Sequence, residues 1–554
     1  MAAPRGAEPA RSRGRLGQPF GRGLAGLLGG AAGVAVAQLV AAATRPQAGP
    51  LVAVGSAVVD AAPTPLKEFA VRTFGTYDKP VLLGGIGLLL AAFAVLTGLL
   101  AARRPIVGVA GAVLFGLVGA VAALTRPAAG PADLLPSATG AMVAAIVLHQ
   151  LPRRAVGAVR SGPPPFGAGA DRTTEGASGP GGAEPVSPPA PDVAAPEPEP
   201  GGAGSTRRNF VRAATVVAGG TVLTGAAGYL LTQIRNRDAA RSRQTVRLPA
   251  AARPAGPLPA GVQPGFHTPN AEFYRVDTAL TVPRLEVDDW RLRIRGRVDR
   301  PVELRFTDLL RRELVERDIT LNCVSGEVGG PYVGTARWLG VLLAPLLREA
   351  GIQAGADQVV ARSVEGMTIG TPVETVLDGR DAMLAVGMNG EPLPHDHGFP
   401  VRMLTPGLYG YAGACKWLTE LELSTFDDFD AYWVRRGWAA RAPVKTASRI
   451  DRPAPFARLS AGPVRVAGVA WAQRRGIRAV EVQVDDGRWQ PASLAPVPSA
   501  DTWVQWRYEW RASTGAHILR VRAVDGRGEV QTGQRATPFP SGATGWHTVS
   551  VTVG

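Results

Sequence analysis

The sequence predicts a multidomain chain in which N-terminal transmembrane helices precede an α+β domain and a C-terminal all-β sandwich. Several long stretches near the N-terminus contain no charged residue. From about residue 244 the composition is that of a soluble protein, and helical and strand-like patterns mix there without a regular βαβ rhythm. Roughly the last hundred residues alternate apolar and polar positions between Asp-Gly turns. A chain of 554 residues is also too long for one domain.

Residues 1–154 form the predicted membrane region. Four stretches lack charged residues, and each is close to the ~20 residues needed to cross the bilayer core. They are residues 24–43, 81–100, 105–125 and 134–151. Such spans must be helical, because lipid offers the backbone no hydrogen-bond partner. Residues 51–71 carry Asp60, Lys67 and Glu68, which favours a loop or a surface helix there instead of a span.

Residues 155–206 predict a disordered linker, because they are rich in Pro, Gly, Ala and Glu and hold too few apolar residues for a core. In residues 207–236, Arg207 and Arg208 stand just before a fifth uncharged span at 213–234. This segment resembles a twin-arginine export signal placed inside the chain. The alternative is an ordinary basic flank that obeys the positive-inside rule. Both interpretations place the linker in the cytoplasm and everything after the fifth span outside.

The distribution of basic residues agrees with this topology. The formal charge is +15, and many arginines flank apolar spans, as Arg103 and Arg104 do. This pattern suits membrane orientation better than phosphate binding, so a nucleic-acid partner is not expected. Five spans and a cytoplasmic N-terminus predict a multi-pass protein of the cell membrane whose C-terminal part is extracytoplasmic.

Two soluble segments follow. In residues 245–445, the stretch 281–306 has short alternating strand-like runs, and 336–351 (ARWLGVLLAPLLREAG) predicts a helix stopped by Gly351. In residues 446–554, the run VQWRYEW alternates apolar and polar positions, which is typical of an antiparallel sandwich. Its aromatic residues Trp506, Tyr508 and Trp510 are interpreted as sandwich core or partner surface, not as a cofactor box.

Cys323 is one of only two cysteines, and it stands between the run ERDITLN and a glycine-rich turn. A thiolate there could bind a soft metal, because a strand end is rigid and the glycines let the backbone approach closely. A buried inert thiol and a disulfide with Cys415 are the alternatives that the residues leave open.

His395 and His397 form an HDH cluster that could share a metal, although a zinc site would need a third ligand. A solvated polar loop is the other interpretation, and a third is that one histidine faces an anionic cofactor. The chain has six histidines, and only His149 lies near a membrane span. A haem held by two axial histidines of this chain is therefore not expected.

A family resemblance rests on segments that occur in order over roughly half the chain. They are TPNAEFYRVDTA, WRLRIRGRVDRPVEL, ITLNCVSGEVGG, ARWLGVLL, VGMNGEPLPHDHGFPVRMLTPGLYGY and CKWLTELELSTFD. Residues from about 266 to 430 resemble the molybdopterin-binding oxidoreductase domain of the sulfite oxidase family. The last hundred or so residues, with GWHTV near the end, resemble its immunoglobulin-like dimerisation domain. The multispan-anchored actinobacterial branch is the most similar in organisation.

The resemblance implies a molybdenum oxidoreductase with one molybdopterin that performs two-electron oxygen-atom transfer. It assigns Cys323 as the metal ligand. The residues that it assigns to cofactor binding are Asn270, Tyr274, Ser363, His397, Arg402 and Lys416. Arginine and lysine suit this role, because a pterin phosphate is a dianion that accepts charge-assisted hydrogen bonds. The implied partners are a small oxo-type substrate, an electron-transfer partner of unknown identity and a second copy bound through the sandwich.

The substrate side departs from the family pattern. Sulfite-oxidising members carry an Arg-Asn-His arrangement after the FY segment, whereas this chain has Arg275, Val276, Asp277 and Thr278. Arg275 and Asp277 are the expected catalytic residues beside Cys323, and an acidic Asp277 that faces the pocket would disfavour sulfite. A sulfoxide reductase-type activity with electrons from a membrane partner is the alternative. A non-catalytic binding or sensor module with a Cys323–Cys415 disulfide is another.

Overall fold

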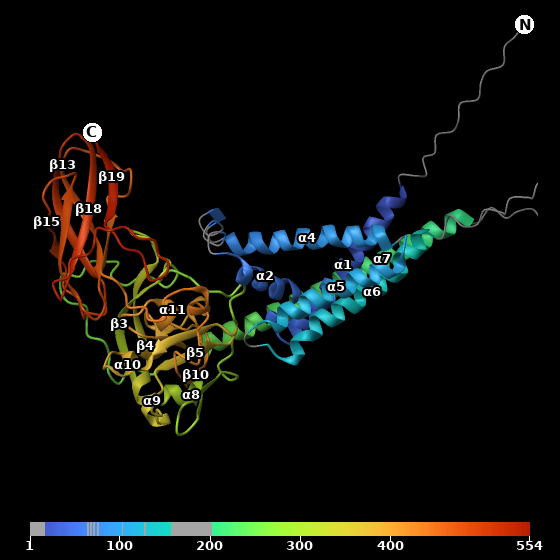
Figure 1. Cartoon of the computed structure of the whole chain (residues 1–554), viewed down its shortest axis with the longest axis horizontal. Helices are drawn as coiled ribbons and strands as arrows, with labels where there is room; N and C mark the ends of the chain where they lie inside the picture. The colour runs from blue at the N-terminus through green and yellow to red at the C-terminus, as the bar shows by residue number, and fades with distance from the viewer. Residues whose placement is uncertain are drawn as a thin grey trace, which may run out of the picture. The chain divides into compact units, whose positions relative to one another are not determined.

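The computed structural model describes residues 17–156, apart from 64–65, 67–68, 70–72, 75–76, 102 and 127–128, together with residues 202–554. The chain divides into two compact units, one that is mainly N-terminal and helical and one that holds residues 126–129 and 232–554. In Figure 1 the colour runs from blue at the N-terminus to red at the C-terminus, so the long N-terminal helices are blue to green. The predicted linker of residues 155–206 lies mostly outside the described residues.

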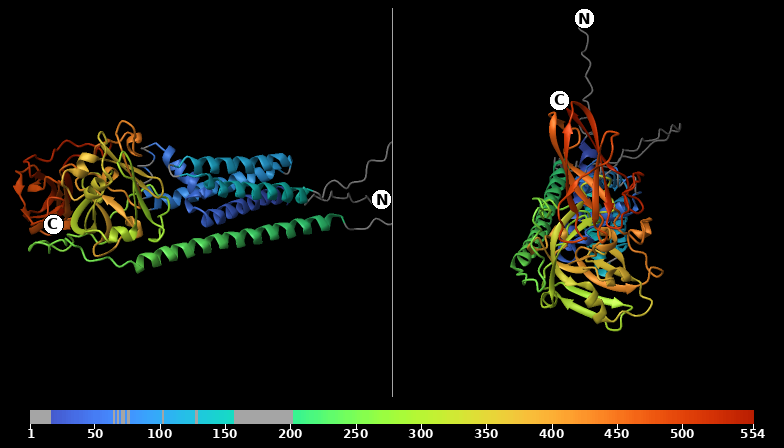
Figure 2. Two further views of the ribbon diagram at one scale, coloured as in Figure 1. Left: turned by 90° about the horizontal axis from the view of Figure 1, so that it is seen from below. Right: turned by 90° about the vertical axis from the view of Figure 1, so that its left-hand side faces the viewer.

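The N-terminal unit is a bundle of long apolar helices, several of which run alongside one another (Figure 2). Its helices are α1 (Gly17–Ala43), η1 (Pro46–Ala48), α2 (Pro50–Ala61), α4 (Asp78–Ala101), α5 (Pro105–Leu124), η3 (Pro131–Leu134) and α6 (Leu135–Val156). In α1, Gly26 approaches Gly98 of α4 so closely that a Cβ on Gly98 would lie 2.5 Å from the α-carbon of Gly26. Such small-residue contacts are typical of helices that pack in membranes.

Five helices in the described residues are long and apolar enough to cross a membrane. Four of them contain a whole stretch that the sequence predicts as a span, the fifth stretch lying within α7 (Gly202–Thr245), and α5 covers the predicted 105–125 except for Thr125. α7 includes Arg207 and Arg208 and continues beyond the predicted end of the span. The segment predicted as a loop or surface helix contains α2, which at 12 residues is shorter than the ~20 that a span needs.

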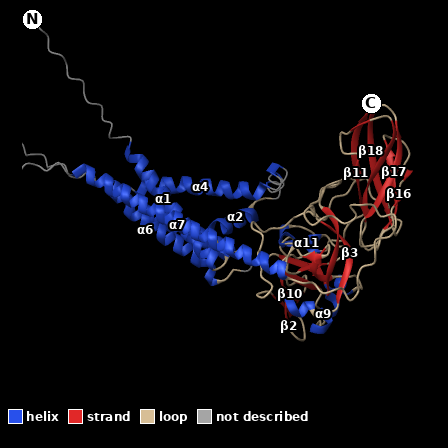
Figure 3. Ribbon diagram, turned by 180° about the vertical axis from the view of Figure 1, so that it is seen from behind, coloured by secondary structure: helices blue, strands red, loops and turns tan. Residues whose placement is uncertain are grey.

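The middle region, residues 245–445, mixes strands and short helices as predicted, and is built on two sheets (strands in red, Figure 3). The first has the order β2-β1-β10-β5-β6, and the second β3-β4-β7-β8 with β9 paired to β7. The strands are β1 (Arg291–Gly296), β2 (Val302–Arg305), β3 (Leu314–Asn322), β4 (Val333–Leu342), β5 (Gln358–Ser363), β6 (Thr368–Pro372), β7 (Met383–Met388), β8 (Glu391–Pro392), β9 (Arg402–Leu404) and β10 (Leu418–Ser424). The helices are α8 (Phe306–Leu310), α9 (Leu343–Ala350), α10 (Val373–Leu377), η4 (His395–His397), α11 (Gly410–Gly413) and η5 (Val434–Arg436).

The helix predicted over 336–351 is wrong in its first half. Residues up to Leu342 belong to β4, and only Leu343–Ala350 forms a helix, which ends at Gly351 with φ +74° as predicted. The apolar run fits either state locally. It becomes a strand because β4 pairs with β3 on one side and with β7 on the other, and these pairs provide hydrogen-bond partners for its backbone N–H and C=O groups. Pairing with distant segments therefore overrides the helical pattern.

The C-terminal region, residues 446–554, is β-rich and has two sheets of its own. Their orders are β11-β13-β17-β16 and β12-β19-β18-β14-β15. The strands are β11 (Ala447–Arg452), β12 (Arg458–Leu459), β13 (Gly462–Trp471), β14 (Ile477–Val484), β15 (Gln490–Pro491), β16 (Ser493–Leu494), β17 (Val504–Ala512), β18 (Gly515–Asp525) and β19 (His547–Val553). All of these pairs are antiparallel except β12 with β19, which the predicted antiparallel pattern did not include. Trp506 and Trp510 of β17 lie in the buried core, as predicted.

Candidate functional site

Cys323 directly follows the last residue of β3, at the strand end that the sequence predicts. Its backbone N–H donates to the Tyr332 carbonyl at 3.0 Å, which closes the glycine-containing loop between them. The side chain is half-buried, and its Sγ lies 2.8 Å from the Ser325 hydroxyl. Burial raises the pKa of the Cys323 thiol, whereas the Ser325 contact and the Lys416 charge act in the opposite direction.

Arg402 opens β9 and is only 6% exposed. Its Nη1 donates to the His397 carbonyl at 3.1 Å, and its guanidinium lies 5.1 Å from the centroid of the Trp338 ring. Its Nε has no hydrogen-bond partner, and no carboxylate of the described residues pairs with it. Burial lowers the pKa of Arg402 to about 10. A buried cation without a counter-ion is costly, so this position is suited to an anion that the chain itself does not supply.

Lys416 is the second buried cation, and Gly398 brings its backbone next to Arg402. Gly398 has φ +108°, and a Cβ there would lie 3.1 Å from both the α-carbon of Lys416 and the Arg402 Cβ. The Lys416 ammonium donates to Asp277 Oδ2 at 2.8 Å and to the Asp396 carbonyl at 3.2 Å. Burial lowers the pKa of Lys416 to about 8, against the opposing effect of Asp277.

Asp277 joins the two predicted catalytic positions to this lysine. Its side chain is 3% exposed, and the same Oδ2 accepts from Arg275 Nε at 3.0 Å. Arg275 also lies 3.5 Å from a carboxylate oxygen of Asp396. The Asp277 carboxylate therefore forms ion pairs with both Arg275 and Lys416, which the sequence did not indicate.

The two histidines of the HDH cluster are both buried, so the solvated-loop interpretation is wrong. His397 Nε2 lies 2.9 Å from the Asn270 carbonyl, and the His395 ring packs edge-on against Phe399. Burial lowers the pKa of each histidine to about 4, so both rings are neutral at pH 7. The described residues hold no cluster of three metal-ligating side chains, so a zinc site here finds no support.

The remaining predicted cofactor contacts have partners within the protein. The Asn270 side chain accepts from Asn389 Nδ2 at 2.9 Å and donates to Glu391 Oε1 at 2.5 Å. The Ser363 hydroxyl accepts from the Met367 N–H at 3.1 Å within the turn after β5. Because Asn270 and Ser363 already bind other groups of the protein, they are less available to a cofactor than the other predicted cofactor-binding residues.

Tyr274 lies between the phenyl ring of Phe273, stacked at 5.2 Å, and the Tyr332 ring at 6.2 Å. Burial is the largest cause that raises the pKa of Tyr274, and the charge of Cys323 adds to it. The structure therefore brings Tyr274 to the loop that carries the predicted metal ligand.

Glu365 is a site residue that the sequence reasoning missed. It is 7% exposed, and burial followed by the nearby charge of Asp277 raises its pKa to about 7. Its Oε1 accepts from the Thr278 hydroxyl at 3.3 Å. The local sequence ARSVEG does not indicate that Glu365 is buried, because only tertiary contacts bury this carboxyl group.

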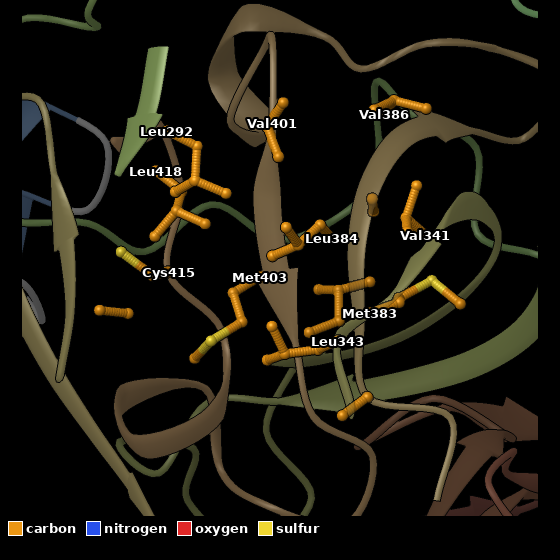
Figure 4. Close-up of a cluster of buried hydrophobic side chains, with 14 of the residues drawn as sticks. Leu292, Val341, Leu343, Met383, Leu384, Val386, Val401, Met403, Cys415 and Leu418 are labelled. Atoms are coloured by element: carbon orange, nitrogen blue, oxygen red, sulfur yellow. The ribbon is translucent and has the colours of Figure 1, made fainter. Parts of the chain in front are cut away.

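Both cysteines are free thiols in the structure, which does not contain the alternative disulfide. Cys415 lies in the hydrophobic core beside Met403 and Leu418 (Figure 4), where it is 1% exposed. Burial raises the pKa of the Cys415 thiol to about 12, so it remains protonated and inert. Cys323 is thus the more accessible of the two thiols.

Comparison with known proteins shows which class this arrangement belongs to. Residues 279–433 match the model of the oxidoreductase molybdopterin binding domain. Sulfite oxidase of Gallus gallus is 30% identical over 315 residues, which cover 48% of this chain and 68% of that protein. The uncharacterized oxidoreductase YuiH of Bacillus subtilis is 30% identical over 178 residues, which cover 32% of this chain and 81% of that protein. The sulfane dehydrogenase SoxCD from Paracoccus pantotrophus is 25% identical, covers 49% of this chain and 76% of its own, and has a TM-score of 0.44.

These matches define a protein with an oxidoreductase molybdopterin binding domain. The chain belongs to the sulfite oxidase family. It spans only 51% of the mouse sulfite oxidase and 59% of the human one.

The site residues fit the cofactor that this family implies. A pterin phosphate is an anion, and the unpaired Nε of Arg402 and the adjacent Lys416 ammonium are buried donors for one. Cys323 offers a thiol at a rigid strand end nearby, and Lys416 is close enough to act on its pKa. These buried donors therefore fit a cofactor with an anionic tail.

Proposed function

We propose that this chain is a membrane-anchored, extracytoplasmic molybdopterin-dependent oxidoreductase with Cys323 as the protein ligand of molybdenum. The observation that carries the proposal is the buried guanidinium of Arg402, whose Nε has no partner and which no carboxylate of the described residues neutralises. When bound, the cofactor would supply two-electron oxygen-atom transfer. The protein fixes the geometry and the charge around it.

The side chains have separate tasks in this proposal. Arg402 and Lys416 hold the anionic part of the cofactor, and His397 supports this pocket in its neutral form. Cys323 provides a thiolate from the end of β3. Asp277 orients Lys416 and Arg275 at distances of 2.8 Å and 3.0 Å, and these residues line the approach for substrate.

Metal analysis of the purified full-length chain tests the proposal. We expect close to one molybdenum per chain, and oxidation or reduction of a small oxo-type substrate with an artificial electron carrier. A chain that folds but contains no molybdenum after growth with molybdate would reject the assignment. Loss of activity on growth without molybdate is the matched control.

A sulfoxide-type substrate is a second candidate, because Asp277 leaves less positive charge for an anion such as sulfite. Its Oδ2 pairs with both Arg275 and Lys416, and it is nearly fully buried. A neutral sulfoxide needs no such charge, whereas sulfite does. The name of the chicken relative favours sulfite, and the charge pattern of this chain favours the neutral substrate.

Substitution of Asp277 tests this choice. In Asp277→Asn, we expect the specificity ratio of sulfite over a neutral sulfoxide, measured as kcat/KM, to rise about tenfold, or roughly 1.4 kcal/mol. The reason is that the removed negative charge repels the sulfite anion and not the neutral sulfoxide. Asp428→Asn is the matched control, since Asp428 pairs with Arg297 and is 56% exposed. An unchanged ratio in Asp277→Asn, or an equal rise in the control, would contradict a role of Asp277 in substrate choice.

The proposed location rests on the apolar helices and their arginine flanks. Five helices have the length and composition of membrane spans in the described residues. If Arg207 and Arg208 form a twin-arginine signal, the soluble part crosses the membrane folded and loaded. We expect the double change of both to Lys to trap it inside, as measured by protease protection in intact spheroplasts. Normal surface delivery of this variant would favour the plain positive-inside interpretation.

The C-terminal region is proposed to be an immunoglobulin-like sandwich that contributes to a homodimer. The support is its two β-sheets and the buried aromatic residues of β17. An electron-transfer partner of unknown identity is expected.

A further inference from the structure

Cys323 directly follows β3, and the C-terminal region contacts the end of that strand. Among the named strands β3 pairs with β4, and near its start Val315 forms a single bridge with Arg253. Near the end of β3, the Thr320 N–H donates to the Asp501 carbonyl at 2.9 Å. The Thr320 hydroxyl accepts from the Trp503 N–H at 2.7 Å, and its carbonyl accepts from Gln473 Nε2 at 3.1 Å. Each polar group of Thr320 is therefore bound by a residue of the C-terminal region.

Gln473 extends this support to the residue just before the thiol. The same Nε2 donates to Oδ1 of Asn322, the last residue of β3. Gln473 is 1% exposed and Asn322 is 3% exposed. A buried hydrogen bond of this kind fixes a backbone direction, because losing it leaves polar atoms unpaired away from water.

The loop after Cys323 is seated on the C-terminal region as well. Gly329 has a positive φ of +77°, and a Cβ there would overlap the His547 imidazole. The ring is itself fixed, since its Nδ1 accepts from the Ile450 N–H at 2.9 Å. Arg449 Nη1 donates to the Gly330 carbonyl at 3.0 Å. These contacts hold Gly329 and Gly330 against the C-terminal region.

An apolar cluster joins the same two regions. Val324, next to the thiol, is 5% exposed and lies in one core cluster with Val469, Trp471 and Trp503 of the C-terminal region. The segments before and after Cys323 are thus held by polar and apolar contacts from residues more than a hundred positions away along the chain.

We propose that the C-terminal region positions the metal-binding thiol, with Gln473 and His547 as positioning residues for Cys323. This role goes beyond dimerisation, because it acts within one copy of the chain. A metal ligand needs such outer support to keep its geometry. The inference rests on the proposed function only in taking Cys323 as the ligand.

The test uses the full-length chain produced without molybdate and measures the alkylation rate of Cys323. Cys415 is 1% exposed, so the fast-reacting thiol is Cys323, and Cys323→Ser identifies its signal. In Gln473→Leu and in His547→Ala, we expect alkylation of Cys323 to accelerate by roughly three- to tenfold. Losing one or two hydrogen bonds, or a packed ring, increases the fraction of molecules in which the segment around the thiol is open to the reagent. In chains grown with molybdate, we expect a parallel fall in molybdenum content.

Val482→Ala is the matched control, because Val482 is 0% exposed in the separate core of the C-terminal region. It should lower the melting temperature and leave the alkylation rate of Cys323 unchanged. Unchanged alkylation in both folded positioning variants would overturn the proposal, as would an equal acceleration in Val482→Ala. Lack of molybdenum in the unaltered chain would instead reject the proposed function. The alkylation rates would still show whether the C-terminal region positions Cys323.

Discussion

Cys323→Ser is expected to lose most of the molybdenum and nearly all of the activity of the full-length chain. A serine oxygen is a harder and less polarisable ligand than a thiolate, so it should be a poorer substitute for cysteine sulfur on molybdenum. Outer-sphere changes at metal sites already cost roughly 10–100-fold, so loss of the ligand itself should cost at least about a hundredfold in kcat. Metal analysis and steady-state kinetics measure both effects.

Cys415→Ala is the control for this substitution. Cys415 is buried in the hydrophobic core, so we expect its loss to lower stability by about 1 kcal/mol and to leave the molybdenum content unchanged. If Cys323→Ser kept its metal and its activity, the ligand assignment would be wrong. If both single variants lost the metal equally, a shared structural role of the two thiols would be the better explanation.

Arg402→Met should have opposite effects on stability and on cofactor binding. The pKa of Arg402 is lowered from 12.5 to about 10 by burial, which corresponds to a cost of roughly 3 kcal/mol for holding the charge in the cofactor-free fold. The sign follows because a base whose folded pKa is depressed destabilises the fold at any pH below that pKa, and the cost is relieved as the pH rises above it. Methionine keeps much of the volume without the charge.

The cofactor-free Arg402→Met chain should therefore be more stable by about 1–3 kcal/mol, which raises its melting temperature by a few degrees. Its molybdenum content after growth with molybdate should fall by roughly a hundredfold, because the anion loses its buried donor. Calorimetry and metal analysis on the same two preparations give the comparison. Lower stability of the cofactor-free variant would show that the charge is compensated within the chain.

Two further variants separate charge from shape. Arg402→Lys keeps a cation but loses the planar fork, so we expect an intermediate molybdenum content. Arg311→Met is the control on the surface, since Arg311 is 78% exposed and pairs with Asp308 within one helical turn. It should change neither quantity measurably.

Much of this protein could be read from local patterns. The apolar stretches indicated helices of membrane-spanning length, because length and lack of charge are properties of a continuous segment. The strand end before Cys323, the stop at Gly351 and the buried aromatic residues of β17 were predicted for the same reason. Each of these features depends on one continuous segment of the chain.

The site itself depended on contacts between distant segments. Asp277 and Lys416 are 139 positions apart and form one ion pair, Glu365 is buried by its surroundings, and residues 336–342 are a strand because two others pair with them. Sequence motifs supplied the residue types at the site, and the lack of a counter-ion for Arg402 among the described residues is visible only when every neighbour is in place. The sequence by itself determined the helices of membrane-spanning length, the end of β3 and the chemical groups that are present. The tertiary structure decided which of these charges are paired, because burial and pairing are properties of the packed chain.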